Sequence, residues 1–236
     1  MAIDKFFVKH FILELRYKPL RTDKSTDNLS NTAVVEKFYS KFEKFTLNPA
    51  RLIDEETCRE YVFEPLRHWY GKENAYNFMG GIPELKEILD FAYSQSNFKE
   101  IGRVGLRYYV IAQESEPKKA EFYKNLLYKY LPIAPDFSKK EPPVSEAGLY
   151  SHVSVPDNKW FLRFGSFVST KDVAARYHKF KSAEQQIPGL MYDLDFYRVD
   201  LPAKDFKIEE HITETYDMAV NFIKRHVNYL ETGKWQ

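Results

Sequence analysis

Hydrophobic and polar positions alternate along several segments of the chain, and this period of two is typical of strands that bury one face. The alternation is clearest in three segments: Phe6–Tyr17, Arg103–Ile111 and Leu190–Phe196. Pairs of extended segments that are joined by a short turn predict two hairpins, Arg59–Tyr70 with Ala75–Met79 and Leu149–Val155 with Lys159–Phe167. The pattern therefore predicts an antiparallel sheet.

A different spacing, with apolar residues three to four positions apart, predicts helices in other segments. The longest runs from Asp205 to about Leu230 and carries a continuous apolar stripe on one face. Shorter helices are predicted at Thr32–Leu47, Pro83–Ser94, Pro117–Tyr130 and Ser169–Ala183. Because strands and helices do not alternate regularly, as a doubly wound fold requires, we predict an α+β fold in which helices cover an antiparallel sheet.

A proline-rich stretch beyond the middle of the chain is the best candidate for a boundary. We therefore predict an N-terminal α+β half over residues 1–131, a connection over 132–148 and a C-terminal α+β half over 149–236. Two arrangements of these halves stay open: they are related to one another, or they form a single domain.

The composition is that of a globular chain, with 44% hydrophobic and 29% charged residues and a single cysteine, Cys58, which excludes an internal disulfide. Lysine and arginine total 35 against 34 acidic residues, so the net charge of +1 provides no overall basic excess for a nucleic acid. No apolar run approaches the ~18 residues of a membrane-spanning helix, and the first residues lack a secretory pattern. We expect a cytoplasmic protein with no membrane partner.

The dipeptide Leu-Arg followed by a ring occurs four times, each time in a predicted strand, and its arginines are Arg16, Arg67, Arg107 and Arg163. Alternation places each leucine and ring on one face of its strand and the arginine on the other. If the strands are neighbours, four guanidinium groups line one sheet face, where they suit carboxylate or phosphate partners. The simpler interpretation is that each arginine is solvated and pairs with a nearby glutamate.

The aromatic content of 17% is high, and although most rings belong to a core, we expect Tyr109 to reach the surface as a binding residue. Tyrosine together with arginine is typical of protein interfaces and also of base-stacking grooves. The near-neutral net charge favours a protein partner or self-association over a nucleic acid.

Asp193 and Asp195 alternate along one predicted strand, so both carboxylates share a face and could hold Mg²⁺ or Ca²⁺ together. The sequence places no third ligand beside them, and a solvated strand face is the simpler explanation. The chain has no glycine-rich phosphate loop, nucleophile elbow or paired-histidine zinc motif. We expect no cofactor.

The chain opens with a strand that ends in Glu14-Leu15-Arg16-Tyr17 and has a central strand with Gly105-Leu106-Arg107-Tyr108. It closes with the strand around Asp193–Asp195 and a long helix that contains His211. This order resembles a sporadically distributed family of uncharacterised prokaryotic proteins, although the family's proline-rich lead-in before the first strand is missing. The family has no established activity, so the resemblance implies no catalytic residues.

We therefore expect a non-enzymatic binding or assembly protein that uses an aromatic and arginine-bearing sheet face to contact a protein partner or a second copy of itself. Two alternatives stay open. One is a nucleic-acid-associated protein of a defence or toxin–antidote system, and the other is a hydrolase that uses Asp193, Asp195 and a divalent metal.

Overall fold

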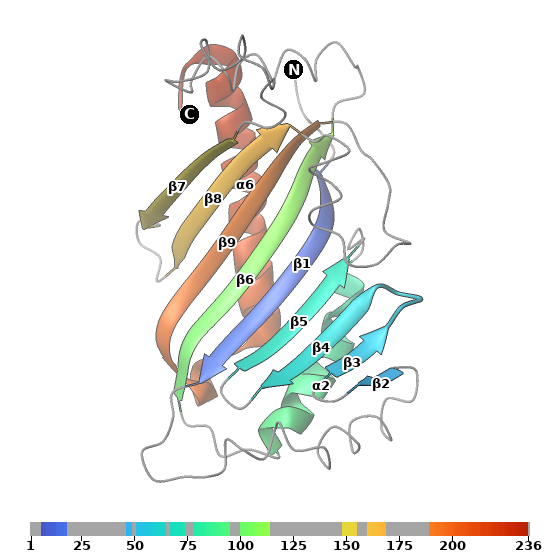
Figure 1. Cartoon of the computed structure of the whole chain (residues 1–236). Coiled ribbons are helices and arrows are strands. Elements are labelled where there is room, and N and C mark those ends of the chain that lie inside the picture. Colours follow the sequence, from blue (N-terminus) through green and yellow to red (C-terminus); the bar gives the residue numbers. More distant parts are fainter. Residues whose placement is uncertain are drawn as a thin grey trace, which may run out of the picture.

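The computed structural model describes residues 6–17, 46–48, 51–64, 67–73, 78–94, 100–113, 148–154, 160–168 and 189–235. Within these ranges the chain forms one antiparallel sheet of nine strands in the order β2-β3-β4-β5-β1-β6-β9-β8-β7 (Figure 1). The strands are β1 (Phe6–Tyr17), β2 (Thr46–Asn48), β3 (Arg51–Asp54), β4 (Arg59–Glu64), β5 (Arg67–Glu73), β6 (Glu100–Gln113), β7 (Gly148–Ser154), β8 (Phe161–Val168) and β9 (Gly189–Pro202).

Two α-helices lie on the same face of this sheet, and Figure 1 shows both of them behind the strands. Helix α2 (Ile82–Ser94) covers the part of the sheet around β4 and β5, and helix α6 (Ile208–Thr232) crosses behind the long central strands. Short 3-10 turns precede them, η2 (Phe78–Gly81) and η4 (Ala203–Asp205). Helix α6 ends at Gly233, whose left-handed φ of 72° lets its N–H bond the carbonyl of Tyr229.

The main hydrophobic core lies between the sheet and the two helices. Every second residue of β6 points into it, and Val104, Leu106 and Tyr108 are fully buried there. From α6, the predicted apolar stripe contributes a matching set of residues with no exposed surface: Ile212, Ala219 and Ile223. The hydroxyl of Tyr108 also donates to the carbonyl of Ile212, at 3.2 Å, which ties the helix to the central strand.

The predicted fold class is confirmed: the protein is α+β, with an antiparallel sheet, helices on it and a long C-terminal helix. Strands occupy the alternating segments, and α2 begins one residue before the predicted helix start at Pro83. The helices predicted at 117–130 and 169–183 lie outside the described residues. The helix predicted at 32–47 also lies mostly outside them, and its last part is wrong because Thr46–Asn48 form β2.

The first predicted hairpin is placed wrongly, because Arg59–Tyr70 is not one strand: β4 ends at Glu64 and pairs with β5, which begins at Arg67. Gly71, which we expected in the turn, lies inside β5 instead. The reason is a close approach: a Cβ at Gly71 would lie 2.4 Å from the ring of Trp69, which occupies that space. A glycine in a strand thus serves packing here and not a turn.

The strands before and after the proline-rich stretch belong to the same sheet. Strand β6, from the predicted N-terminal half, pairs with β9, from the predicted C-terminal half, from Glu100 opposite Pro202 to Gln113 opposite Gly189. Together with β1 these two strands form the centre of the sheet. The two halves therefore share one sheet in the part of the chain that the structure describes.

Candidate functional site

The strand register places six arginines on the sheet face opposite the helices, Arg51 on β3 and five more on β5, β1, β6 and β8. Directly paired residues share a face, and Arg16 pairs with Arg67 on β5 and with Arg103 on β6. Arg107 lies four residues along β6 from Arg103 and pairs with Asp195, which in turn pairs with Arg163 on β8. We call the face that carries these five residues the arginine face. It includes all four arginines of the Leu-Arg-ring repeat.

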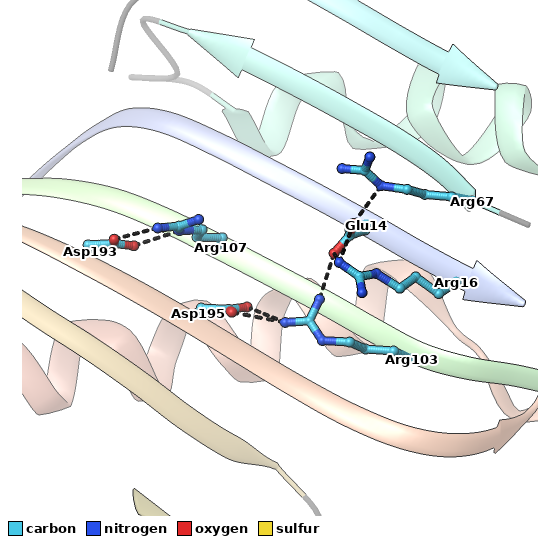
Figure 2. Close-up of polar contacts among 7 residues, drawn as sticks. All are labelled: Glu14, Arg16, Arg67, Arg103, Arg107, Asp193 and Asp195. Carbon is cyan, nitrogen blue, oxygen red and sulfur yellow. Dashed lines mark hydrogen bonds and ion pairs between the residues drawn. The ribbon is translucent and has the colours of Figure 1, made fainter. Parts of the chain in front are cut away.

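Glu14 lies at the centre of this face and accepts hydrogen bonds from arginines on three neighbouring strands (Figure 2). Nε of Arg67 is 2.6 Å from Oε1, and Nη1 of Arg103 is 2.7 Å from Oε2. Nη2 of Arg16 is 3.1 Å from Oε1. The side chain of Glu14 is only 12% exposed, so guanidinium groups replace most of the water that a carboxylate needs.

The two aspartates of β9 each accept two hydrogen bonds from an arginine of β6 (Figure 2). Arg103 donates to Asp195 at 2.9 and 3.1 Å, and Arg107 donates to Asp193 at 2.6 and 2.7 Å. Such paired bonds fix the orientation of both planar groups. The carboxylates that we considered as metal ligands thus point at guanidinium groups, and among the described residues no group of three His, Cys, Asp or Glu could hold a metal ion.

The ionisation of these groups follows from their neighbours. Burial disfavours the charge of Glu14, but the hydrogen bond from Arg16 and the charges of Arg67 and Arg103 outweigh it and lower the pKa of the carboxyl. Burial raises the pKa of Asp195, and the nearby arginines offset this only in part. Glu14 therefore stays ionised well below neutral pH, and its charge holds the three guanidinium groups together.

Gly105 explains how Arg103 reaches two carboxylates at once. It lies on the arginine face between Glu14 of β1 and Tyr197 of β9. A Cβ at this position would lie 2.5 Å from Nη1 of Arg103, so the guanidinium occupies the space that a side chain would fill. The same guanidinium lies over the ring of Tyr197, 5.0 Å from its centroid, which gives it a second flat support.

Tyr109 is buried, and the prediction that it reaches the surface is wrong. It is 5% exposed because it packs with Ile111 and Met191 in a second, smaller apolar cluster on the arginine face. Its ring stacks on His10, with 5.5 Å between centroids, and the guanidinium of Arg107 lies 4.9 Å above it. Tyr109 therefore supports Arg107 from below.

Three of the four arginines that the sequence predicts as binding residues have side chains with much exposed surface, 58% for Arg16, 41% for Arg67 and 40% for Arg107. Arg163 is exposed and lies across the strand pair from Asp195. The sequence interpretation missed Glu14 and Arg103, which connect the others. An acid between Leu13 and Leu15 in an apolar strand was the available signal, because a charge in such a segment needs a partner.

Comparisons with known proteins identify no relative, since no family model, curated protein or solved structure matches the chain. The resemblance to the uncharacterised prokaryotic family stays a prediction. No described helix is both long enough and apolar enough to cross a membrane.

Proposed function

We propose that the protein is a non-enzymatic binding or assembly protein that contacts its partner through the arginine face. The observation that supports this most directly is the exposure of its guanidinium groups. Arg16, Arg67 and Arg107 keep 58%, 41% and 40% of their side-chain surface exposed, although each also bonds a carboxylate of the face, Glu14 or Asp193. Guanidinium groups bind carboxylate and phosphate groups through paired hydrogen bonds, so an anionic partner fits.

The arrangement also supports a prearranged surface. Arg103 is bonded to Glu14 and Asp195 at once and lies over Tyr197, so little side-chain freedom is lost when it contacts a partner. Arg16 and Arg107 are held at one end by a carboxylate and keep 58% and 40% of their side-chain surface exposed. A surface of this kind favours binding over proton transfer, because arginine stays protonated at any working pH.

The metal-dependent hydrolase, which we considered from the sequence, has no observation in its favour. Its two candidate ligands, Asp193 and Asp195, each accept bidentate bonds from an arginine, as described above. A divalent cation there would have to displace a guanidinium group from each carboxylate. The contacts of Asp193 and Asp195 therefore favour a binding protein over a metal-dependent hydrolase.

The proposal is tested with a pair of double variants. Arg16→Ala/Arg163→Ala removes two exposed charges from the arginine face while Arg67 and Arg103 still hold Glu14. The matched control, Lys204→Ala/Lys224→Ala, removes two exposed charges outside that face. We measure self-association by sedimentation velocity and binding to labelled poly-glutamate and oligothymidylate. At least one interaction should weaken in the first variant and persist in the control. The proposal is wrong if self-association, poly-glutamate binding and oligothymidylate binding are all absent, or if the two double variants change them equally.

A further inference from the structure

A group of polar side chains joins the start of α6 to the end of β9. Its members are His211 and Glu214 of α6, Arg198 of β9 and Trp160, which directly precedes β8. We call them the α6 cluster. His211 is 6% exposed and Trp160 is 1% exposed, so both rings are shielded from water. The cluster lies on the face that the helices cover, because Arg198 pairs with Val104 of the main core.

The guanidinium of Arg198 contacts every other member of the α6 cluster. Its Nη1 lies 3.0 Å from Nε2 of His211, and its Nη2 donates to Oε2 of Glu214 at 3.3 Å. The guanidinium also lies over the ring of Trp160, 4.3 Å from its centroid. Trp160 in turn donates from Nε1 to the same oxygen of Glu214, at 2.9 Å. One cation thus connects β9 with the first turns of α6.

The contact with Arg198 determines which nitrogen of a neutral His211 carries the proton. A guanidinium has only N–H donors, so Nε2 of His211 must be the acceptor. The proton is therefore on Nδ1, which donates to the carbonyl of Lys207, the N-cap residue of α6, at 2.7 Å. The backbone nitrogen of Lys207 is also near Nδ1, at 3.1 Å, but an accepting Nδ1 would leave a donor on Nε2 against Arg198.

A second proton on His211 is incompatible with this contact. Both ring nitrogens of an imidazolium are donors, so Nε2 of His211 and Nη1 of Arg198 would point two N–H groups at each other. The two groups would also carry the same charge. A protonated His211 and Arg198 therefore have to separate.

The described groups around His211 include charges of both signs. Burial is the largest influence and lowers the pKa of His211, and the charge of Arg198 lowers it further. The hydrogen bond to the backbone of Lys207 and the charges of Glu214 and Glu210 raise it, but they offset the lowering only in part. The ammonium group of Lys207 pairs with Glu210, at 3.2 Å. The other two neighbours are uncharged rings, Trp160 and Phe206.

We propose that the α6 cluster is a proton-operated latch between β9 and α6. While His211 is neutral, Arg198 holds the start of α6 against the end of β9. When His211 takes up a proton, the two side chains separate, and Arg198 keeps its contacts with Glu214 and Trp160. The segment of residues 203–214, from η4 into α6, then opens more often. The latch is independent of the proposed function, since it uses no residue of the arginine face.

Hydrogen exchange followed by mass spectrometry tests this opening on the full chain. The comparison is with His211→Gln, whose amide oxygen can still accept from Arg198 but which takes up no proton. The ratio of exchange rates of residues 203–214, natural chain over variant, should rise about tenfold from pH 7.5 to pH 5, because a hydrogen bond to a charged group is worth at least that factor. Using a ratio at each pH cancels the intrinsic pH dependence of exchange.

Residues 219–230 of α6 are the internal control. They include His226, which is also buried but contacts the hydroxyl of Tyr192 and has a pKa of about 4, so it stays mostly neutral at pH 5. The ratio of exchange rates over residues 219–230 should therefore be the same at both pH values.

A second variant tests the partner of His211. Arg198→Met removes the cation and keeps an unbranched side chain beside Trp160. An NMR titration of the ring of His211 should give a midpoint below about 6.5, the ordinary value for histidine, in the natural chain. The midpoint should be higher in Arg198→Met, because the like charge that opposes the proton is gone.

Three results would overturn the latch. The first is a ratio of exchange rates over residues 203–214 that does not change with pH. The second is an equal change over residues 219–230, because the response then belongs to the whole chain. The third is a midpoint of His211 that Arg198→Met leaves unchanged or lowers. If a variant does not fold, the natural chain decides: a midpoint at or above 6.5, or no titration before the chain unfolds, also overturns the latch.

Discussion

Two buried histidines make the stability of the fold depend on pH in a way that can be calculated. His68 on β5 is 3% exposed and His226 on α6 is 5% exposed. Burial disfavours their charged forms and lowers the pKa of His68 to about 3 and that of His226 to about 4. Each ring accepts or donates one hydrogen bond at Nδ1, to the hydroxyl of Tyr17 and of Tyr192 respectively. Both are therefore neutral in the folded chain.

The sign of the effect follows from proton linkage. An unfolded histidine has a pKa of about 6.5, so the unfolded chain binds protons below that pH while the folded chain does not. The contribution of the two neutral histidines to the free energy of unfolding is therefore complete above pH 6.5. It is lost as the pH falls from 6.5 toward the pKa values that the two rings have in the folded chain. At pH 5, where the unfolded form is protonated and the folded form is mostly not, each histidine costs about 2 kcal/mol relative to pH 7.5. The two together cost about 4 kcal/mol.

Urea denaturation at pH 7.5 and pH 5 measures this loss. Staying at pH 5 or above keeps most carboxylates ionised, because their usual pKa values are about 4. The variants His68→Gln and His226→Gln remove one titrating group each, so the difference between the two pH values should shrink by about 2 kcal/mol in each. A difference equal to that of the natural chain in both variants would show that these rings are not buried as neutral groups, and would refute the reasoning.

Three further substitutions test other contacts, each by urea denaturation. Gly105→Ala should destabilise the fold by about 1–3 kcal/mol, because its Cβ would displace the guanidinium of Arg103, 2.5 Å away, from charged partners. In an Arg103→Met background, Gly105→Ala should lower the free energy of unfolding by much less, because the guanidinium that it displaces is absent. Gly71→Ala is the control on the same face, and its effect on the free energy of unfolding should be the same with and without Arg103→Met. Tyr108→Phe should cost about 1 kcal/mol, since a fully buried hydroxyl loses its hydrogen bonds to α6, and an unchanged stability would contradict that contact. Gly233→Ala should cost about 1 kcal/mol because only glycine adopts its φ of 72° without strain, and a neutral result would argue against that backbone conformation.

Local patterns predicted the long strands and the two helices of this fold, but not the short strands β2 and β3, nor which strands are neighbours. The period of two in Arg103–Ile111 predicts which residues of β6 are buried, because it depends only on that strand. The same period predicts that each repeat arginine lies opposite its leucine. The pairing of Glu14 with Arg103 depends instead on strands whose residues are 89 positions apart, and no local pattern carries that information.

The errors have equally specific causes. A glycine at position 71 predicts a turn because glycine is typical of turns, but here it makes room for the ring of Trp69. Tyr109 was expected at the surface because the chain has more rings than we assigned to a core, but a second apolar cluster buries it. Asp193 and Asp195 were predicted to share a face, which they do, but the arginines that face them lie on another strand.

The central position of β6 has a consequence for how the chain is made. Its 14 residues pair on one side with the N-terminal β1 and on the other with β9, which is synthesised only after the proline-rich stretch. Until then one edge of β6 lacks its native partner strand, and an unpaired edge of this length is a template for pairing with other chains. A ribosome that stalls or a truncation at residues 132–148 should therefore yield an aggregating product, and the complete chain should fold slowly because its central contacts are so distant in sequence.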